Sequence, residues 1–164
     1  MEASRLQDSK KKAGEQEEFS SLMGKIEYLM ELRKSSEMEE KMQRSKAGRK
    51  YFSDSRNTAV KNAIIVALEG AERLADSFYR AELFMASIVI IQKHYGMDEP
   101  SKTFRIMHPQ VGGKLMEAYS GYLKAAHELM NKETGTENRT QLMANIDYVE
   151  QQRKRIAFFE TKRS

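Results

Sequence analysis

The sequence predicts an all-α protein in which an extended basic helical arm, a helix-turn-helix, precedes a helical bundle. Apolar residues recur at steps of three and four over most of the chain, which is the spacing of one helix face. Only two prolines interrupt the 164 residues, and 32% of the residues are charged. No segment has the alternating pattern of a strand that could find a partner. We expect the arm to cover residues 1–58 and the bundle to cover residues 59–164.

The arm begins with a polar segment and continues as a long helix. Residues 1–14 show no apolar face, so we expect them to be disordered unless a partner orders them. Residues 15–46 follow the helical period, densely between residues 19 and 30 and thinly afterwards. At about 1.5 Å per residue such a helix reaches roughly 45 Å, more than a compact domain of this size needs. We therefore expect it to project, or to pack along something other than its own core.

A break and a second long apolar pattern follow. Gly48 and the Ser-Asp-Ser cluster at residues 53–55 predict the end of the first helix, and a serine of that cluster could cap the next one. The apolar pattern then runs to residue 96, which is too long for one ordinary globular helix. Asp76 or Ser77 is a suitable N-cap for a new helix, so we divide the pattern there.

The rest of the chain is predicted to form further helices. Residues 86–91 are apolar on all sides and should be the most buried segment. Gly96 should end that helix, and residues 100–107 should form a short segment that His108 and Pro109 close. A clear amphipathic helix is predicted over residues 114–131, after Gly112 and Gly113, and a polar turn over residues 131–138. In the last helix we expect these residues to face inward: Leu142, Ile146, Val149, Ile156 and Phe159.

The residue types needed for catalysis or metal binding do not occur at suitable spacings. The chain has no cysteine, which excludes disulfides and thiolate metal sites. His94, His108 and His127 lie on different predicted elements and lack a second ligand nearby. Neither a phosphate-binding loop nor a dinucleotide fingerprint is present. We expect no enzyme activity, cofactor, catalytic residue or metal ligand. The absence of a secretory signal favours an intracellular protein.

Positive charge is concentrated in residues 41–61. This stretch has a charge of +6, more than the +4 of the whole chain, and it also holds Tyr51, Phe52 and Gly48. Bunched cations beside aromatic residues are typical of a protein that binds a phosphate backbone. A solvated face, an acidic protein partner and an anionic membrane are the alternatives.

We expect eight cations in and beside this stretch to contact nucleic acid. Few side chains are placed for base recognition, so binding should be largely independent of base sequence. If about six phosphates are neutralised, the affinity should fall roughly a thousandfold between 50 and 200 mM salt. The predicted contact residues are Lys34, Lys41, Arg44, Lys46, Arg49, Lys50, Arg56 and Lys61.

A resemblance adds to this interpretation. Residues 94–102, His-Tyr-Gly-Met-Asp-Glu-Pro-Ser-Lys, with Gly113-Lys114 and Ala118-Tyr119 after them, resemble a stretch of the major coat proteins of filamentous and rod-shaped double-stranded DNA viruses of archaea (lipothrixvirus, tristromavirus or rudivirus type). The similarity covers about thirty residues. It implies an N-terminal helical arm that wraps DNA and a C-terminal bundle that packs on neighbouring subunits. The long, charged N-terminal part is more similar to the filamentous type.

The function implied by the resemblance is that of a structural coat protein. Such a protein forms a dimer with itself or a paralogue and wraps double-stranded DNA in the A form inside a helical virion. It assembles in the host cytoplasm. The resemblance does not decide whether an outer lipid envelope covers the virion. Two alternatives remain. The chain could be a small helical RNA-binding subunit of an RNA-guided effector complex. It could also be a helical adaptor whose apolar stripe at residues 19–30 fills a partner's groove.

Overall fold

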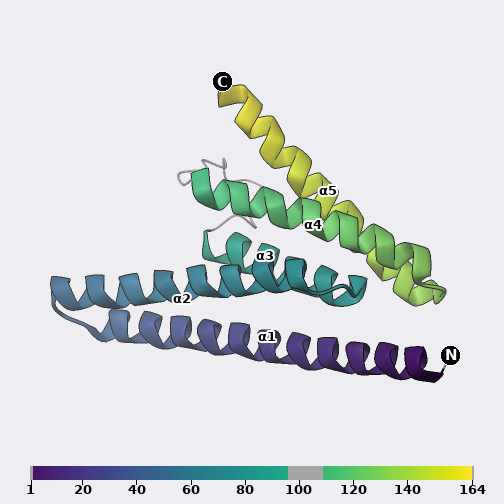
Figure 1. Cartoon of the computed structure of the whole chain (residues 1–164). Helices are drawn as coiled ribbons and strands as arrows, with labels where there is room; N and C mark the ends of the chain where they lie inside the picture. Colours follow the sequence, from purple (N-terminus) through teal and green to yellow (C-terminus); the bar gives the residue numbers. More distant parts are fainter. Residues whose placement is uncertain (1, 96–108, 164) are drawn as a thin grey trace. The chain divides into compact units, whose positions relative to one another are not determined.

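The described residues form helices joined by short connections, and they divide into two compact units. The computed structural model describes the backbone of residues 2–95 and 109–163, and the side chains of residues 12–51, 54–95 and 112–156. These residues form five helices and no strand, which confirms the all-α class (Figure 1). The units are residues 1–74 and residues 75–164. The boundary that the sequence predicted after residue 58 falls inside a helix that continues to Arg73.

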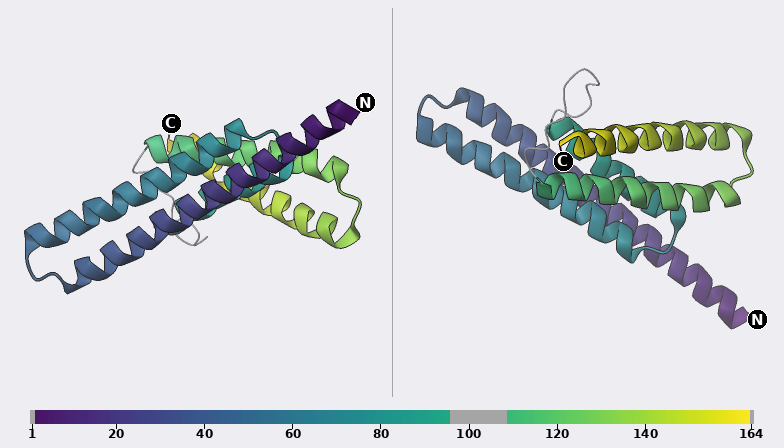
Figure 2. Two further views of the ribbon diagram at one scale, coloured as in Figure 1. Left: turned by 60° about the horizontal axis from the view of Figure 1, so that its bottom comes forward. Right: turned by 90° about the horizontal axis from the view of Figure 1, so that it is seen from above.

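The first unit is an antiparallel hairpin of two long helices, α1 (Glu2–Met42) and α2 (Lys46–Arg73), which lie side by side in Figures 1 and 2. Leu22 and Ile26 of α1 are buried. Ala59 and Ala63 of α2 are also buried, and their small side chains favour close contact between helices. At the far end from the turn, Arg73 pairs with Glu18 at 3.5 Å.

The arm differs from its prediction in extent and in packing. Because α1 begins at Glu2, the disorder expected for residues 1–14 is wrong from Glu2 onward. The helix also ends at Met42, earlier than the predicted residue 46. It packs along α2 within one compact unit, so the expectation that it projects, or packs along something other than its own core, is wrong. The reason is that α2 offers an apolar side along which α1 can bury Leu22 and Ile26.

The turn lies at residues 43–45, because Ser45 supplies the cap that ends the loop. Ser45 has an extended backbone, with φ −88° and ψ 144°, and its Oγ accepts a hydrogen bond from the amide of Gly48 at 3.1 Å. Gly48 and the cluster at residues 53–55 therefore lie inside α2 and do not break it. The predicted break was misplaced because several nearby serines could serve as caps and the spacing alone does not distinguish them.

The second unit consists of α3 (Ser77–His94), α4 (Pro109–Lys132) and α5 (Thr136–Arg163), with α4 packed against both of the others. Asp76 caps α3, as predicted: its Oδ1 accepts from the amide of Phe78 at 2.8 Å. Where α3 meets α4, Gly121 lies against the ring of Phe84, and a Cβ at Gly121 would collide with that ring. A glycine is therefore required at this contact.

Several predictions for this unit are confirmed and others are corrected. Residues 86–91, which the sequence predicts to be the most buried segment, include four buried residues, Ser87, Ile88, Ile90 and Ile91, whereas Val89 is 39% exposed. A helix turns about 100° per residue, which brings one of six consecutive residues to the outside. The inward positions of α5 are confirmed for the residues whose side chains are described: Leu142, Ile146, Val149 and Ile156.

Other predicted features lie outside the described part of the chain or shift slightly. The side chain of Phe159, the cap at Gly96 and the short segment at residues 100–107 lie outside the described residues. Pro109 begins α4, where its lack of an amide hydrogen costs nothing, and Gly112 and Gly113 lie within that helix. The polar turn spans only residues 133–135.

Candidate nucleic-acid interface

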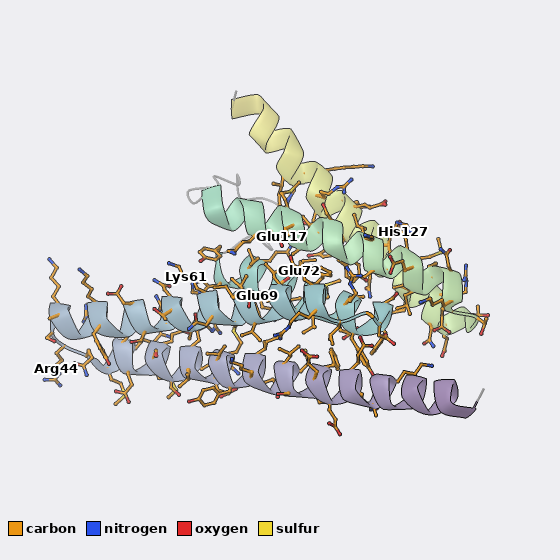
Figure 3. All side chains as sticks on the ribbon, viewed as in Figure 1. Arg44, Lys61, Glu69, Glu72, Glu117 and His127 are labelled. Atoms are coloured by element: carbon orange, nitrogen blue, oxygen red, sulfur yellow. The ribbon has the colours of Figure 1, made fainter. Side chains whose placement is uncertain are left out.

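The predicted basic segment forms the tip of the hairpin and the first turns of α2. Residues 43–45 connect the two helices, and Lys46 is the first residue of α2. Ser45 and Gly48 fix this turn through their hydrogen bond. The sequence thus places Arg44 in the connecting loop, where it projects from the end of the hairpin (Figure 3).

The eight predicted contact residues divide into groups with different surroundings. Four are exposed and form no ion pair with any described residue: Arg44, Lys46, Lys50 and Lys61. On an ideal helix, Lys46, Lys50 and Lys61 fall within about 60° of one another, so they share one side of α2. Lys61 lies on the side of α2 away from α1 (Figure 3). We call these four residues the tip cations.

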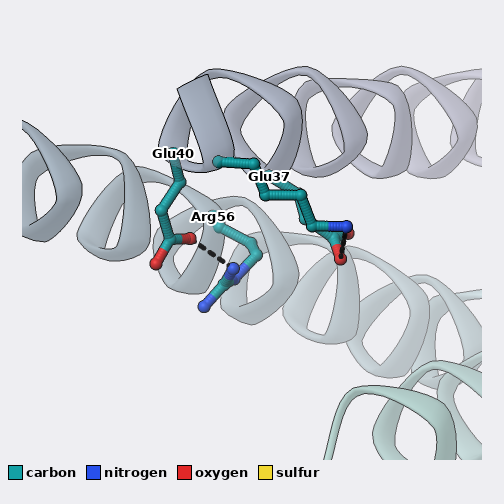
Figure 4. A network of polar contacts seen from close by, with 4 residues as sticks. Glu37, Glu40 and Arg56 are labelled. Carbon is teal, nitrogen blue, oxygen red and sulfur yellow. Dashed lines mark hydrogen bonds and ion pairs between the residues drawn. The ribbon is translucent and has the colours of Figure 1, made fainter. Parts of the chain in front are cut away.

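Arg49 and Arg56 instead hold the hairpin together. The Nε of Arg49 donates to the carbonyl oxygen of Gln43 at 2.9 Å, which joins the first turn of α2 to the end of α1. The Nη1 of Arg56 donates to the Oε2 of Glu40 across the two helices (Figure 4). The side chains of Arg56 and Glu40 are each only 25% exposed. These two arginines are therefore less available to a phosphate than the sequence predicted.

Lys34 and Lys41 lie on α1 and each meets an acid of the same helix. Lys34 Nζ is 3.3 Å from Glu31, and Lys41 Nζ is 4.0 Å from Glu37. Both lysine side chains are largely exposed, at 62% and 77%, so these pairs are weak and screened by salt. Both lysines lie on α1, apart from the side of α2 that carries Lys46, Lys50 and Lys61.

The charges at the start of α2 oppose the stability of that helix. The first turn of a helix carries unsatisfied amide groups and a partial positive charge, and it is normally stabilised by acids. α2 has no acid in its first turn, whereas Lys46 begins it and Arg49 and Lys50 follow within about one turn. Each misplaced cation costs about 0.3–1 kcal/mol at low salt. An anion bound at the tip would remove that cost.

A polar seam near the tip was not recognised from the sequence. From Arg33, the residues at alternating steps of three and four are Ser36 and Glu40 of α1 and Gln43 directly after it, and all four are partly buried. They continue the line that Leu22 and Ile26 begin. Reading the line as a heptad seam regardless of polarity would have revealed that Glu40 faces α2.

The described residues of the second unit contain a polar network that connects its three helices. The Nε2 of Gln92 donates to the hydroxyl of Tyr119 at 2.8 Å, and Tyr148 donates to the Oε1 of Gln92 at 3.1 Å. These bonds join α3, α4 and α5. Burial raises the pKa of Tyr119 to about 12, so its hydroxyl stays protonated at neutral pH. The network therefore fixes the packing of three helices.

Known proteins offer no guide to this site. No protein-family model, curated protein or solved structure matches the chain. Among the described residues, no three His, Asp or Glu side chains lie close enough together to hold a metal ion. Of the helices whose residues are described, none has the length and apolarity needed to cross a membrane.

Proposed function

We propose that this protein is a non-catalytic structural subunit that binds double-stranded DNA through the tip of its α1–α2 hairpin. The observation that carries the proposal is the set of tip cations, which lie exposed and form no ion pair with any described residue. Arg44, Lys46 and Lys50 lie around the start of a helix that has no acid in its first turn, and Lys61 lies about four turns further along it. Such an arrangement costs folding stability, and a bound polyanion offsets that cost.

The geometry of the tip suits contact with a phosphate backbone. Between Lys46 and Lys61, α2 rises by about 22 Å. A DNA strand carries one phosphate per about 3.4 Å of helix axis, so the lysines along this side of α2 can meet phosphates over about six base-pair steps. Lysine acts as a point charge and reads no base pattern, which is why we expect binding without sequence preference.

The fuller form of the proposal is a coat subunit that encloses duplex DNA in a helical filament. The resemblance of residues 94–102 and 113–119 to archaeal virus coat proteins supports it, together with the combination of a basic hairpin and a separate helical unit. The adaptor alternative is less favoured, because Leu22 and Ile26 of its proposed ligand stripe are buried.

A charge-reversal experiment tests the DNA contact. The double variant Arg44→Glu with Lys50→Glu should weaken binding to a 30-base-pair duplex at least a hundredfold in fluorescence anisotropy, while circular dichroism stays helical. The matched control is Lys93→Glu with Lys124→Glu, which changes the net charge equally at exposed positions of the second unit. Equal losses in the two variants would show that only net charge matters, and unchanged binding would exclude the tip.

Electron microscopy of the purified protein with plasmid DNA tests the assembly. Regular filaments that require DNA would support a coat subunit. A preference for RNA without filaments would favour the effector-complex alternative, and indifference to both nucleic acids would contradict the proposal altogether.

A further inference from the structure

The side of α1 opposite to its packed side carries exposed apolar residues. On an ideal helix, Met38 lies about 160° around the axis from the buried Leu22, and Met42 lies about 160° from the buried Ile26. Met38 is 66% exposed, Met42 is 74% exposed, and Tyr28 on the adjoining strip is 63% exposed. We call this side the outer α1 face. It carries Gly24, Tyr28, Met38 and Met42, with Glu31 and Ser35 between them at about 20° from the line of Gly24 and Met42. Glu31 pairs with Lys34 of the same helix at 3.3 Å.

No contact among the described residues accounts for a glycine at position 24. It lies in the middle of α1, where a glycine costs roughly 0.5–1 kcal/mol relative to alanine. A Cβ at Gly24 would meet nothing within 4 Å, so no described neighbour requires the missing side chain. Gly24 lies about five helical turns before Met42, at the same angle around the axis. The outer α1 face therefore carries a residue without a side chain, Gly24, and a residue with a long side chain, Met42, at the same angle.

We infer that the outer α1 face binds the same face of a second copy of this chain, with the two α1 helices antiparallel. One register of the two helices allows two contacts to form together. When Gly24 lies opposite Met42 of the second copy, Tyr28 lies opposite Met38 of that copy, and two-fold symmetry repeats both contacts. Met42 then fills the space over Gly24, and the exposed Tyr28 and Met38 cover each other. A parallel pair in register would instead place Gly24 opposite Gly24 and leave that space unfilled.

The charges beside this face are complementary in the same register. Lys25 and Glu39 lie on one flank of it, and Glu27 and Lys41 lie on the other. An antiparallel pair brings each flank against the same flank of the second copy. Lys25 then comes within a turn of the second copy's Glu39, and Glu27 comes within a turn of its Lys41. Among the described residues Lys25, Glu27 and Glu39 form no ion pair, and Lys41 has only the 4.0 Å contact with Glu37.

The dimer contact depends on α1 alone, whereas one consequence of it rests on the proposed function. In this register the two Met42 positions lie about 27 Å apart along the dimer, and the loops with Arg44 lie further apart. One turn of B-form DNA measures about 34–36 Å. The two hairpin tips of a dimer would therefore contact one duplex about a turn apart.

Cysteine cross-linking tests the contact, because the chain has no cysteine of its own. Full-length Gly24→Cys and Met42→Cys are mixed without nucleic acid, oxidised, and run on a non-reducing gel. We expect a cross-linked dimer that forms at least tenfold faster than in Met143→Cys, an exposed control on α5. Gly24→Cys alone should cross-link at the rate of the control. Equally fast cross-linking of Gly24→Cys alone would show a parallel pair, and no excess in the mixture would overturn the inference.

Two further variants separate this inference from the proposed function. Met38→Lys, added to both Gly24→Cys and Met42→Cys, should abolish their cross-link by placing a charge in the contact, while circular dichroism stays unchanged. Arg44→Glu with Lys50→Glu, added to the same two proteins, should leave the cross-link intact although DNA binding is lost. A cross-link that vanishes with the tip charges would contradict a contact made by the outer α1 face.

Discussion

The salt dependence of DNA binding follows from the number of tip cations. Each neutralised phosphate contributes about −0.9 to the slope of log K against log salt. The structure leaves four of the eight predicted residues exposed and without an acidic partner, so the expected slope is about −3.6 per chain. Between 50 and 200 mM salt the affinity should then fall about 150-fold, less than the thousandfold expected from six contacts.

Removal of one tip cation should change that slope by a defined amount. Lys50→Gln should reduce it to about −2.7, which corresponds to about a 40-fold loss of affinity over the same salt range. The assay is fluorescence anisotropy over a series of salt concentrations with two duplexes of unrelated sequence. Lys93→Gln, an exposed change on α3, is the control and should leave the slope unaltered. A wild-type slope near zero would refute the reasoning, as would equal changes in the two variants.

Two predictions concern the second unit. Gly121→Ala should lower the free energy of unfolding by about 1–3 kcal/mol in urea titrations, because its Cβ would meet the ring of Phe84. Gly113→Ala, where the space is open, should not destabilise, and a second variant with Phe84→Leu should recover part of the loss at residue 121. Tyr119 should ionise last among the tyrosines in an absorbance titration, near pH 12. Because its folded pKa lies above the ordinary value of 10, its contribution to stability is complete below pH 10 and is lost as the pH rises through 12. Tyr119→Phe should remove that loss and leave the Gln92 amide without its acceptor, at a cost of about 1–3 kcal/mol.

The polar seam shows why the sequence underestimated the packing of α1. The apolar stripe of α1 is dense between residues 19 and 30 and thin afterwards. In the structure the same line continues through Ser36 and Glu40, and Glu40 meets a residue sixteen positions away, Arg56. A hydrophobic pattern cannot reveal a seam whose partners are charged.

The sequence by itself determined the helical class, a new helix start at Asp76 or Ser77, and the concentration of positive charge in residues 41–61. Periodicity, capping and charge are properties of neighbouring residues. Only the tertiary structure decided where the hairpin turns and which cations remain unpaired. The sequence pointed to a serine of residues 53–55 as the cap, whereas Ser45 supplies it. The pairing of Arg56 depends on the register in which α1 lies against α2. That register is set by contacts between residues far apart in the chain, so it becomes visible only once the two helices are packed.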